Sequence, residues 1–128
     1  TVLIHDEQPL EKWRDGVMTR MRMSGLLGSR QFCIFDQYCD PGLGAPTHEH
    51  AVEELLEVMD GVAEIWVGGK TSKVTRNQSV MIPAGTKHGF RNVEPSSILH
   101  VRATLAAPIF EALYDDSGQT ARRWRLSV

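Results

Sequence analysis

Short strand-like stretches separated by turn-forming residues predict an all-β protein. Residues 17–23 alternate between apolar and polar side chains, and residues 31–39 are rich in aromatic and β-branched side chains. The second stretch ends at Asp40-Pro41-Gly42, which is typical turn chemistry. Only one segment, near the C-terminus, has the pattern of a helix, so helices are a minor part of the prediction.

The remaining elements follow in order from the same signals. Asp60-Gly61 and Gly68-Gly69 are typical hairpin dipeptides, and Pro83-Ala84-Gly85 predicts a further turn. Residues 109–114 predict a short helix, and residues 115–118 a loop. Further strands are expected at residues 73–75, 79–82, 88–92 and 97–105.

Three histidines and one glutamate are spaced as ligands of a single metal ion. Side chains alternate faces along a strand, so His48, His50 and Glu54 project the same way and converge. Glu53, the competing carboxylate, faces the other side by the same rule. His88 follows a turn that can bring a new strand beside the first. We therefore predict one divalent metal ion per chain, bound by these four residues, with one or two coordination positions left free.

The Asp60-Gly61 turn predicts the side-chain directions of its flanking strands. A two-residue hairpin would pair Met59 with Val62, because loop length fixes the register. Leu55 would then oppose Trp66 on the outer face, and so large an apolar pair is seldom left in solvent. We expect this face to be covered by a second copy in a homodimer, or else by the N-terminal arm. The residues expected to face inward around the ion are Leu56, Val58, Ala63 and Ile65.

The sequence segments around the four predicted ligands resemble the two motifs of the cupin superfamily. Gly42 is followed by five residues, then His48-Glu49-His50, three residues, Glu54, six residues and Gly61. The stretch 83–88, followed by Asn92, is similar to the second motif. Asn77 stands where the family usually has a glycine, but asparagine tolerates left-handed backbone, so the turn is expected to survive.

This resemblance implies a fold and its extent. It implies a small single-domain cupin barrel, also described as a double-stranded β-helix or jelly roll, with a metal-binding interior. We assign residues 17–107 to the barrel, residues 1–16 to an N-terminal arm, and residues 108–128 to a C-terminal helix and tail. Barrels of this kind commonly pair, which adds to the expectation of a homodimer. They also serve many reactions, so the resemblance does not define one.

Three functions are compatible with the predicted site. The ligand set suits Fe(II), Mn, Ni, Zn or Co, and we favour iron(II) in a dioxygenase-type oxidoreductase acting on a small organic molecule. The second function is a non-redox isomerase, lyase or decarboxylase acting on a sugar acid or keto acid. The third is a small-molecule binding or sensor module without turnover. The apolar inner wall favours a ligand with a hydrophobic body and one chelating head.

Three further side chains are candidates for the cavity. Phe90 lies two residues after His88, so on a strand both side chains point to the same face, and Phe90 is expected to pack beside His88. Either Gln37 or Tyr38 faces inward, and Tyr38 is taken as the pocket residue. His100 is the remaining candidate for a general acid or base, with an outward or merely packed histidine as the alternative.

Composition and charge exclude several other classes. At 128 residues, with 41% hydrophobic and 23% charged residues, the chain fits one globular domain. Its net charge of -2 gives no general attraction to nucleic acid or anionic membrane, and no apolar run is long enough to span a bilayer. Cys33 and Cys39 lie six residues apart in one predicted strand, too far to form a disulfide. Free thiols and the lack of a visible targeting segment lead us to expect a cytoplasmic protein.

Overall fold

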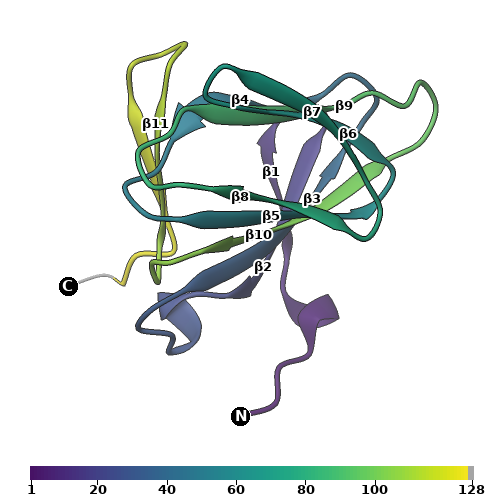
Figure 1. Cartoon of the computed structure of the whole chain (residues 1–128). Coiled ribbons are helices and arrows are strands. Elements are labelled where there is room, and N and C mark those ends of the chain that lie inside the picture. The colour runs from purple at the N-terminus through teal and green to yellow at the C-terminus, as the bar shows by residue number, and fades with distance from the viewer. Residues whose placement is uncertain (127–128) are drawn as a thin grey trace.

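The computed structural model describes residues 1–126, which form two antiparallel sheets that face each other (Figure 1). The strands are β1 (Leu10–Arg14), β2 (Val17–Met23), β3 (Cys33–Cys39), β4 (Gly44–Glu49), β5 (Glu54–Asp60), β6 (Val62–Val67), β7 (Lys70–Thr75), β8 (Gln78–Ile82), β9 (His88–Asn92), β10 (Leu99–Leu105), β11 (Phe110–Tyr114) and β12 (Thr120–Arg123). Sheet A has the order β1-β2-β3-β10-β5-β8, and sheet B has the order β12-β11-β4-β9-β6-β7. The all-β prediction is confirmed.

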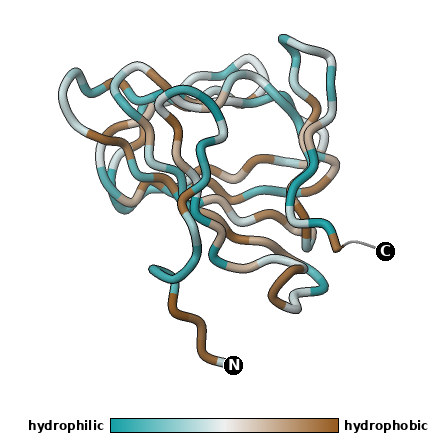
Figure 2. The backbone as a smooth tube through the Cα atoms, turned by 180° about the vertical axis from the view of Figure 1, so that it is seen from behind, coloured by the Kyte–Doolittle hydropathy of each residue, from teal (hydrophilic) through white to brown (hydrophobic). Residues whose placement is uncertain are grey.

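The core lies between the two sheets, because alternate side chains of each strand point inward. In β10 the inward residues Leu99, Val101, Ala103 and Leu105 are all buried. The antiparallel partner of β10 on one side is β3, and on the other side it is β5. Figure 2 shows hydrophobic stretches along the strands and hydrophilic stretches in many of the connecting loops.

The predicted C-terminal helix is wrong, because residues Phe110–Tyr114 form β11. This strand pairs with β4 on one side and with β12 on the other. Phe110 and Ala112 are buried while Leu113 is exposed, as expected for a strand at a sheet surface. A helix this short is unstable alone, whereas β4 and β12 supply this segment with backbone hydrogen bonds on both sides. Residues 127–128 of the predicted tail lie outside the described residues.

The helical segments of residues 1–126 are two 3-10 turns. These are η1 (His5–Glu7) and η2 (Gly25–Leu27), each of three residues. Neither has the length or the apolar character that a helix needs to cross a bilayer.

The segment predicted as an N-terminal arm, residues 1–16, contributes a strand to sheet A. β1 pairs antiparallel with β2, and the register shifts between Lys12 and Arg14. An irregularity of this kind interrupts the strict alternation of side chains, so neighbouring residues can face the same side. Trp13 and Arg14 both line the interior cavity described below.

The predicted hairpin at Asp60-Gly61 is wrong, because its two strands lie in different sheets. β5 pairs with β10 and β8, whereas β6 pairs with β7 and β9. Gly61 has a φ of 93°, a left-handed conformation that glycine tolerates, and it carries the chain from sheet A to sheet B. Leu55 therefore lies opposite Met81, not opposite Trp66. The residues predicted to face inward are nevertheless buried, namely Leu56, Val58, Ala63 and Ile65.

Two other turns agree with the sequence. Gly68-Gly69 joins β6 to β7 as a hairpin in which Val67 pairs with Lys70. Asn77 adopts a φ of 70°, so the asparagine takes the left-handed conformation expected of the glycine it replaces. The cysteines Cys33 and Cys39 are free and buried, as expected.

The close packing of β9 gives a prediction about Gly89. A methyl group on Gly89 would lie 2.7 Å from the carbonyl oxygen of Ala45 and would collide with the indole of Trp66. We expect Gly89→Ala to destabilise the protein by about 1–3 kcal/mol, because the strand has no room for the added carbon. Urea denaturation measures the change. Gly69→Ala is the control, since nothing lies within 4 Å of its added carbon. Equal stability of the two variants would contradict this prediction.

Candidate metal centre

The four residues named as ligands from the sequence come together between the two sheets. His48, His50, Glu54 and His88 are all buried, and one donor atom from each lies within 4.8 Å of the others. Glu54 Oε1 lies 2.9 Å from His50 Nε2 and 3.1 Å from His88 Nε2. Glu53, by contrast, is exposed. The cluster can hold one metal ion.

The four residues reach the cluster from both sheets. From the sequence, the convergence of His48, His50 and Glu54 was instead explained by a single strand. His48 lies in β4, directly opposite His88 in β9, and both strands belong to sheet B. β4 ends at Glu49, after which the chain turns, and Glu54 begins β5 in sheet A. The prediction that His48, His50 and Glu54 share one strand is therefore wrong. Two facing sheets, rather than one strand, bring the carboxylate to the imidazoles.

A bulge in β4 aims His48 inward. Ala45 pairs with Phe90 and His48 pairs with His88, so three steps along β4 correspond to two along β9. The extra residue shifts the alternation, and Ala45 and His48 are consequently both buried. Pro46 lies within this bulge, where its missing backbone N–H costs least.

Backbone carbonyls fix the orientation of the three imidazole rings. A carbonyl oxygen can only accept, so each ring carries a proton on Nδ1, and Nε2 of a neutral ring presents its lone pair. Proteins commonly orient metal-binding histidines in this way. One of these carbonyls belongs to β11, so the strand predicted as a helix positions a ligand. The Nδ1···O distances are 2.7 Å from His48 to Pro46, 2.7 Å from His50 to Glu111 and 2.8 Å from His88 to Thr86.

The electrostatics of the cluster fit a divalent cation. Burial, assisted by the two neighbouring imidazoles, lowers the pKa of His48 to about 3, so this ring is neutral at pH 7. Burial opposes ionisation of Glu54, but hydrogen bonds from His50 and His88 outweigh it and lower the pKa of Glu54 to about 2. Burial also lowers the pKa of His88, but Glu54 raises it by more. A metal ion would replace the protons that the Glu54 carboxylate attracts to the neighbouring imidazoles. A set of three nitrogen ligands and one oxygen ligand suits Fe, Mn, Co, Ni or Zn.

A small cavity adjoins the four ligands. Its volume is about 20 Å³, room for about one water molecule. Leu56 and Phe90, both predicted as pocket residues, line it. Val58, Ala63 and Ile65 are buried in the core but are not part of its wall.

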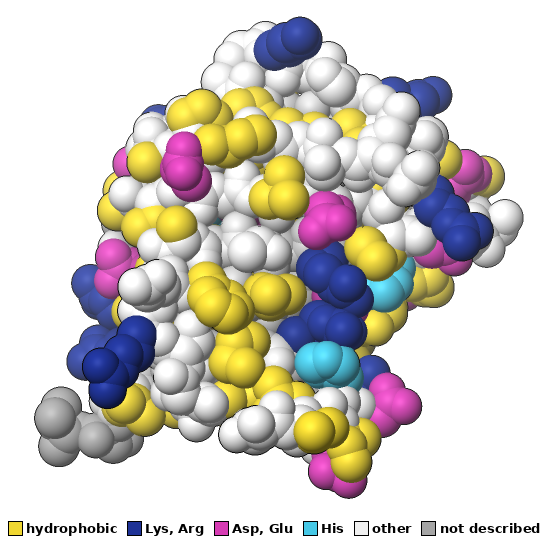
Figure 3. All heavy atoms as spheres, turned by 60° about the horizontal axis from the view of Figure 1, so that its bottom comes forward, with side chains coloured by type: hydrophobic (Ala, Val, Ile, Leu, Met, Phe, Trp, Pro, Cys, Tyr) yellow, Lys and Arg dark blue, Asp and Glu magenta, His cyan; other side chains and the backbone are white. Residues whose placement is uncertain are grey.

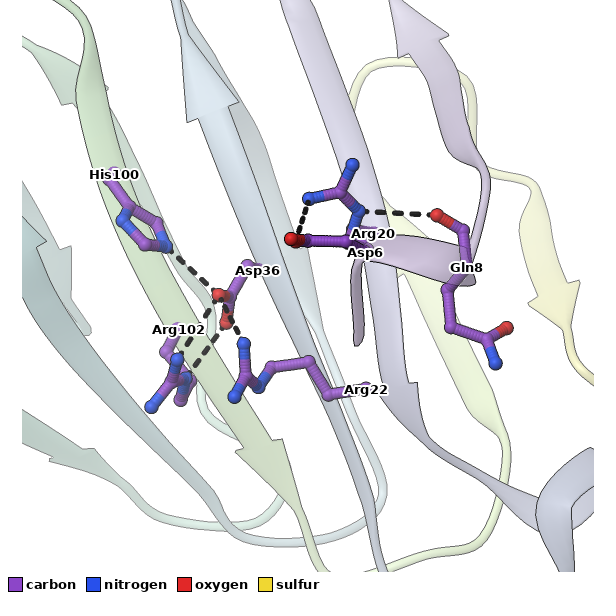
Figure 4. Close-up of polar contacts among 7 residues, drawn as sticks. All are labelled: Asp6, Gln8, Arg20, Arg22, Asp36, His100 and Arg102. Carbon is purple, nitrogen blue, oxygen red and sulfur yellow. Dashed lines mark hydrogen bonds and ion pairs between the residues drawn. The ribbon is translucent and has the colours of Figure 1, made fainter. Parts of the chain in front are cut away.

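Tyr38 lies on the outer face of sheet A, so its predicted place in the pocket is wrong. In β3 the inward side chains of Phe35 and Gln37 line the cavity. Tyr38 stacks on His100, with ring centroids 4.4 Å apart. His100 Nε2 in turn lies 2.9 Å from Asp36 Oδ2 (Figure 4). His100 is thus a packed outer-face histidine, and its geometry does not support the acid-base role considered from the sequence.

The sequence reasoning missed cavity residues near both chain ends. Trp13 and Arg14 belong to the segment predicted as an arm, and Phe110 and Tyr114 to the segment predicted as a helix. All four line the cavity. The available signal for β11 was weak, because Phe110 and Ala112 flank the charged Glu111 but the apolar Leu113 interrupts the alternation.

Fold and site together define a β-barrel with an interior cluster suited to one metal ion. A family model described as Cupin domain matches residues 36–102, more than half of the chain. The chain belongs to the cupin family.

Comparisons with individual proteins agree with this fold. An uncharacterized protein of Streptomyces coelicolor is 35% identical over 69 residues, which are 54% of this chain and 64%, less than two thirds, of that relative. An RmlC-like cupin from Shewanella frigidimarina has a TM-score of 0.71 at 18% identity, covering 83% of this chain and 88% of the other. The polyketide cyclase RemF from Streptomyces resistomycificus has a TM-score of 0.72 at 20% identity, with 82% and 78% covered. Lactobacillus farciminis oxalate decarboxylase has a TM-score of 0.78 at 14% identity, with 88% and 35% covered. At these identities the structures show similarity of fold alone.

Proposed function

We propose that this chain is a metal-dependent enzyme that uses one divalent ion, with iron(II) favoured, for dioxygenase-type chemistry on a small organic molecule. The observation that carries the proposal is the buried cluster of three inward-facing imidazoles and one carboxylate beside a cavity. A bound iron(II) would supply coordination positions for dioxygen and a chelating substrate. With Glu54 as its charged ligand, the site would have a net charge of about +1, which favours an anionic substrate.

The protein's own side chains would orient the substrate and exclude water. The walls of Phe35, Leu56 and Phe90 are buried and apolar, so polar interactions inside the cavity are weakly screened. Gln37 is a polar exception in this wall, and its amide Nε2 donates to Thr19 Oγ1 over 3.0 Å. This hydrogen bond holds the amide in one orientation, as a substrate-positioning group requires.

Two alternatives use the same site. A non-redox isomerase, lyase or decarboxylase of a sugar acid or keto acid is supported by two similar folds, which belong to a polyketide cyclase and an oxalate decarboxylase. A binding or sensor module without turnover is supported by the small cavity, which has room for little more than a water molecule in this conformation.

Elemental analysis by mass spectrometry, on protein purified without a metal-affinity step, tests the proposal. We expect about one equivalent of metal per chain. Iron, with oxygen uptake in the presence of a trial chelating substrate, would support the dioxygenase. Manganese, nickel or zinc with turnover but without oxygen uptake would support the non-redox enzyme, and a ligand recovered unchanged would support the sensor. A protein that takes up no metal after reconstitution would contradict all three.

We also propose a homodimer formed through the outer face of sheet A. Leu55 and Met81 are paired there and are 39% and 50% exposed, and Phe32 lies in the same groove. Figure 3 shows apolar side chains beside basic ones on the face turned toward the viewer. Such a patch is typical of an interaction surface. Chemical cross-linking at micromolar concentration should trap a dimer of the wild type but not of Leu55→Lys, and a wild type that stays monomeric would refute the proposal.

A cytoplasmic location is proposed from the cysteines. Burial raises the pKa of Cys33 and of Cys39 to about 12, so both thiols stay neutral and unreactive in the folded protein. Free thiols are usual in reducing compartments. Fractionation of the native cells would test this location, and recovery outside the cytoplasm would contradict it.

A further inference from the structure

The metal cavity meets the protein surface at three side chains. Trp13, Arg14 and Tyr114 are partly exposed, whereas the other lining side chains are buried. Trp13 and Arg14 come from β1 in sheet A, and Tyr114 comes from β11 in sheet B. Residues from opposite ends of the chain therefore close the mouth of the cavity.

Arg14 is a partly buried cation without an acidic partner among residues 1–126. It donates instead to two neutral acceptors, the Gly44 carbonyl at 3.3 Å and the Tyr114 hydroxyl at 3.1 Å. Its guanidinium also lies 5.2 Å from the centre of the Tyr114 ring. A partly desolvated cation is stabilised best by an anion, so this position is suited to an anion that arrives with a ligand. The other partly buried arginines in this part of the chain each pair with a carboxylate, namely Arg20, Arg22, Arg102 and Arg123.

Tyr114 connects this cation to the metal ligands. It pairs in register with His48, and the two rings lie 5.2 Å apart between centroids. Its hydroxyl oxygen accepts a hydrogen bond from Arg14. The hydroxyl proton is donated to no group of residues 1–126, so it is available to a ligand. Trp13 has a buried indole N–H with no acceptor in the same part of the chain. The mouth of the cavity is thus rich in donors and poor in acceptors.

We infer that the ligand of the metal site is a small acid with a carboxylate additional to its metal-chelating oxygens, and that Arg14 and Tyr114 bind this carboxylate. The inference rests on the proposed metal function. The planar guanidinium can hold a carboxylate through two hydrogen bonds, with the phenol as a further donor. The carboxylate would replace the Arg14–Tyr114 contact that now closes the mouth.

Charge and size narrow the class of ligand to a small dicarboxylate. A divalent ion with Glu54 leaves a charge of about +1, and Arg14 adds another, so a dianion neutralises both. The cavity of about 20 Å³ admits a ligand only when the contact between Arg14 and Tyr114 opens, which disfavours a large body. The sequence-based expectation of a ligand with a hydrophobic body did not take Arg14 into account, because Arg14 was not assigned to the cavity.

Isothermal titration of the cobalt(II)-loaded protein with glycolate and with tartronate tests the inference. Both probes chelate a metal through a hydroxyl and a carboxylate, but tartronate has one carboxylate more. We expect the wild type to bind tartronate at least about tenfold more tightly than glycolate. Arg14→Gln should lose this preference while its affinity for glycolate changes by less than about twofold. Arg14→Lys should keep part of the preference, because lysine retains the positive charge but lacks the paired, coplanar N–H donors of the guanidinium.

Cobalt content and thermal denaturation, measured on each variant, separate the outcomes. Arg91→Gln is the matched control, since Arg91 is exposed and pairs with Glu64 on the outer face of sheet B. It should bind tartronate as the wild type does. If Arg14→Gln fails to fold, Tyr114→Phe replaces it and should weaken tartronate binding about threefold. A wild type that takes up no cobalt would refute the metal site and this inference with it. Full cobalt uptake without a preference for tartronate, or a preference that survives Arg14→Gln, would overturn the inference alone.

Discussion

The His50→Ala protein is expected to lose stoichiometric metal, with affinity reduced by more than about 100-fold. Both ring nitrogens of His50 are positioned, because its Nε2 faces Glu54 over 2.9 Å while its Nδ1 is held by the Glu111 carbonyl. Alanine would remove one nitrogen donor and leave Glu54 with one imidazole partner fewer. Mass spectrometry of protein reconstituted with iron(II), cobalt(II) or zinc(II) and then desalted measures the remaining metal.

Two further variants make this result specific. His88→Ala should weaken metal binding to a similar extent, because His88 faces the same Glu54 oxygen over 3.1 Å. His100→Ala is the matched control, since His100 lies on the outer face of sheet A and contacts Asp36. It should keep about one equivalent of metal. A full equivalent retained by His50→Ala would show that the ligand assignment is incorrect.

The members of the buried cluster could be predicted from the sequence, but the reason for their convergence could not. The spacing of His48, His50 and Glu54 identified the residues, and parity separated Glu54 from Glu53. The alternation of side chains along a strand selected residues that do come together, but for an incorrect reason, because Glu54 begins a new strand in the opposite sheet. The bulge that turns His48 inward depends on pairing with β9, some forty residues away, and no local pattern reports such pairing.

The mouth of the cavity shows why the chain ends were harder to predict. Arg14 and Tyr114 touch although 100 residues separate them. Local periodicity detects the central strands well, such as Val17–Met23, which the sequence located at both ends. β1 lies at the edge of sheet A, and β11 lies next to the edge of sheet B. Strands at or near an edge are defined more by their partners than by their own composition, so these segments were assigned as arm and helix.

Asp36 illustrates a signal that the sequence contained. Asp36 and Tyr38 lie two residues apart, so on one strand they point to the same face. An ionised carboxylate is costly inside a barrel. That cost favours Asp36 and Tyr38 on the outer face and Gln37 on the inner one, as the structure shows. What parity cannot predict is that Asp36 is only 1% exposed although it lies on the outer face. Its burial comes from three cationic or ionisable neighbours on other strands.

These neighbours make Asp36 the second site at which a single substitution should have a large effect. Arg102 donates to Asp36 over 2.8 and 3.2 Å, Arg22 over 3.2 Å, and His100 lies at 2.9 Å (Figure 4). We expect Asp36→Asn to destabilise the protein by about 3 kcal/mol at pH 7, because two guanidinium groups would lose their counter-ion. The estimate is kept at the low end of the range for buried pairs, since both arginines are about a quarter exposed. Urea denaturation measures the free energy of unfolding.

The dependence of this effect on pH distinguishes charge from packing. Burial opposes ionisation of Asp36, but His100 and Arg102 outweigh it and lower its pKa from 3.8 to about 2. A carboxyl with a lowered pKa in the folded state contributes fully above its unfolded pKa and loses this contribution as pH falls through the folded pKa. The stability difference between wild type and Asp36→Asn should therefore be smaller at pH 3 than at pH 7. Asp15→Asn is the control, because Asp15 forms an exposed pair with Lys12 and should change stability little at either pH. A difference that stays constant across this range would mean that the shape of the side chain, not its charge, holds the three neighbours together.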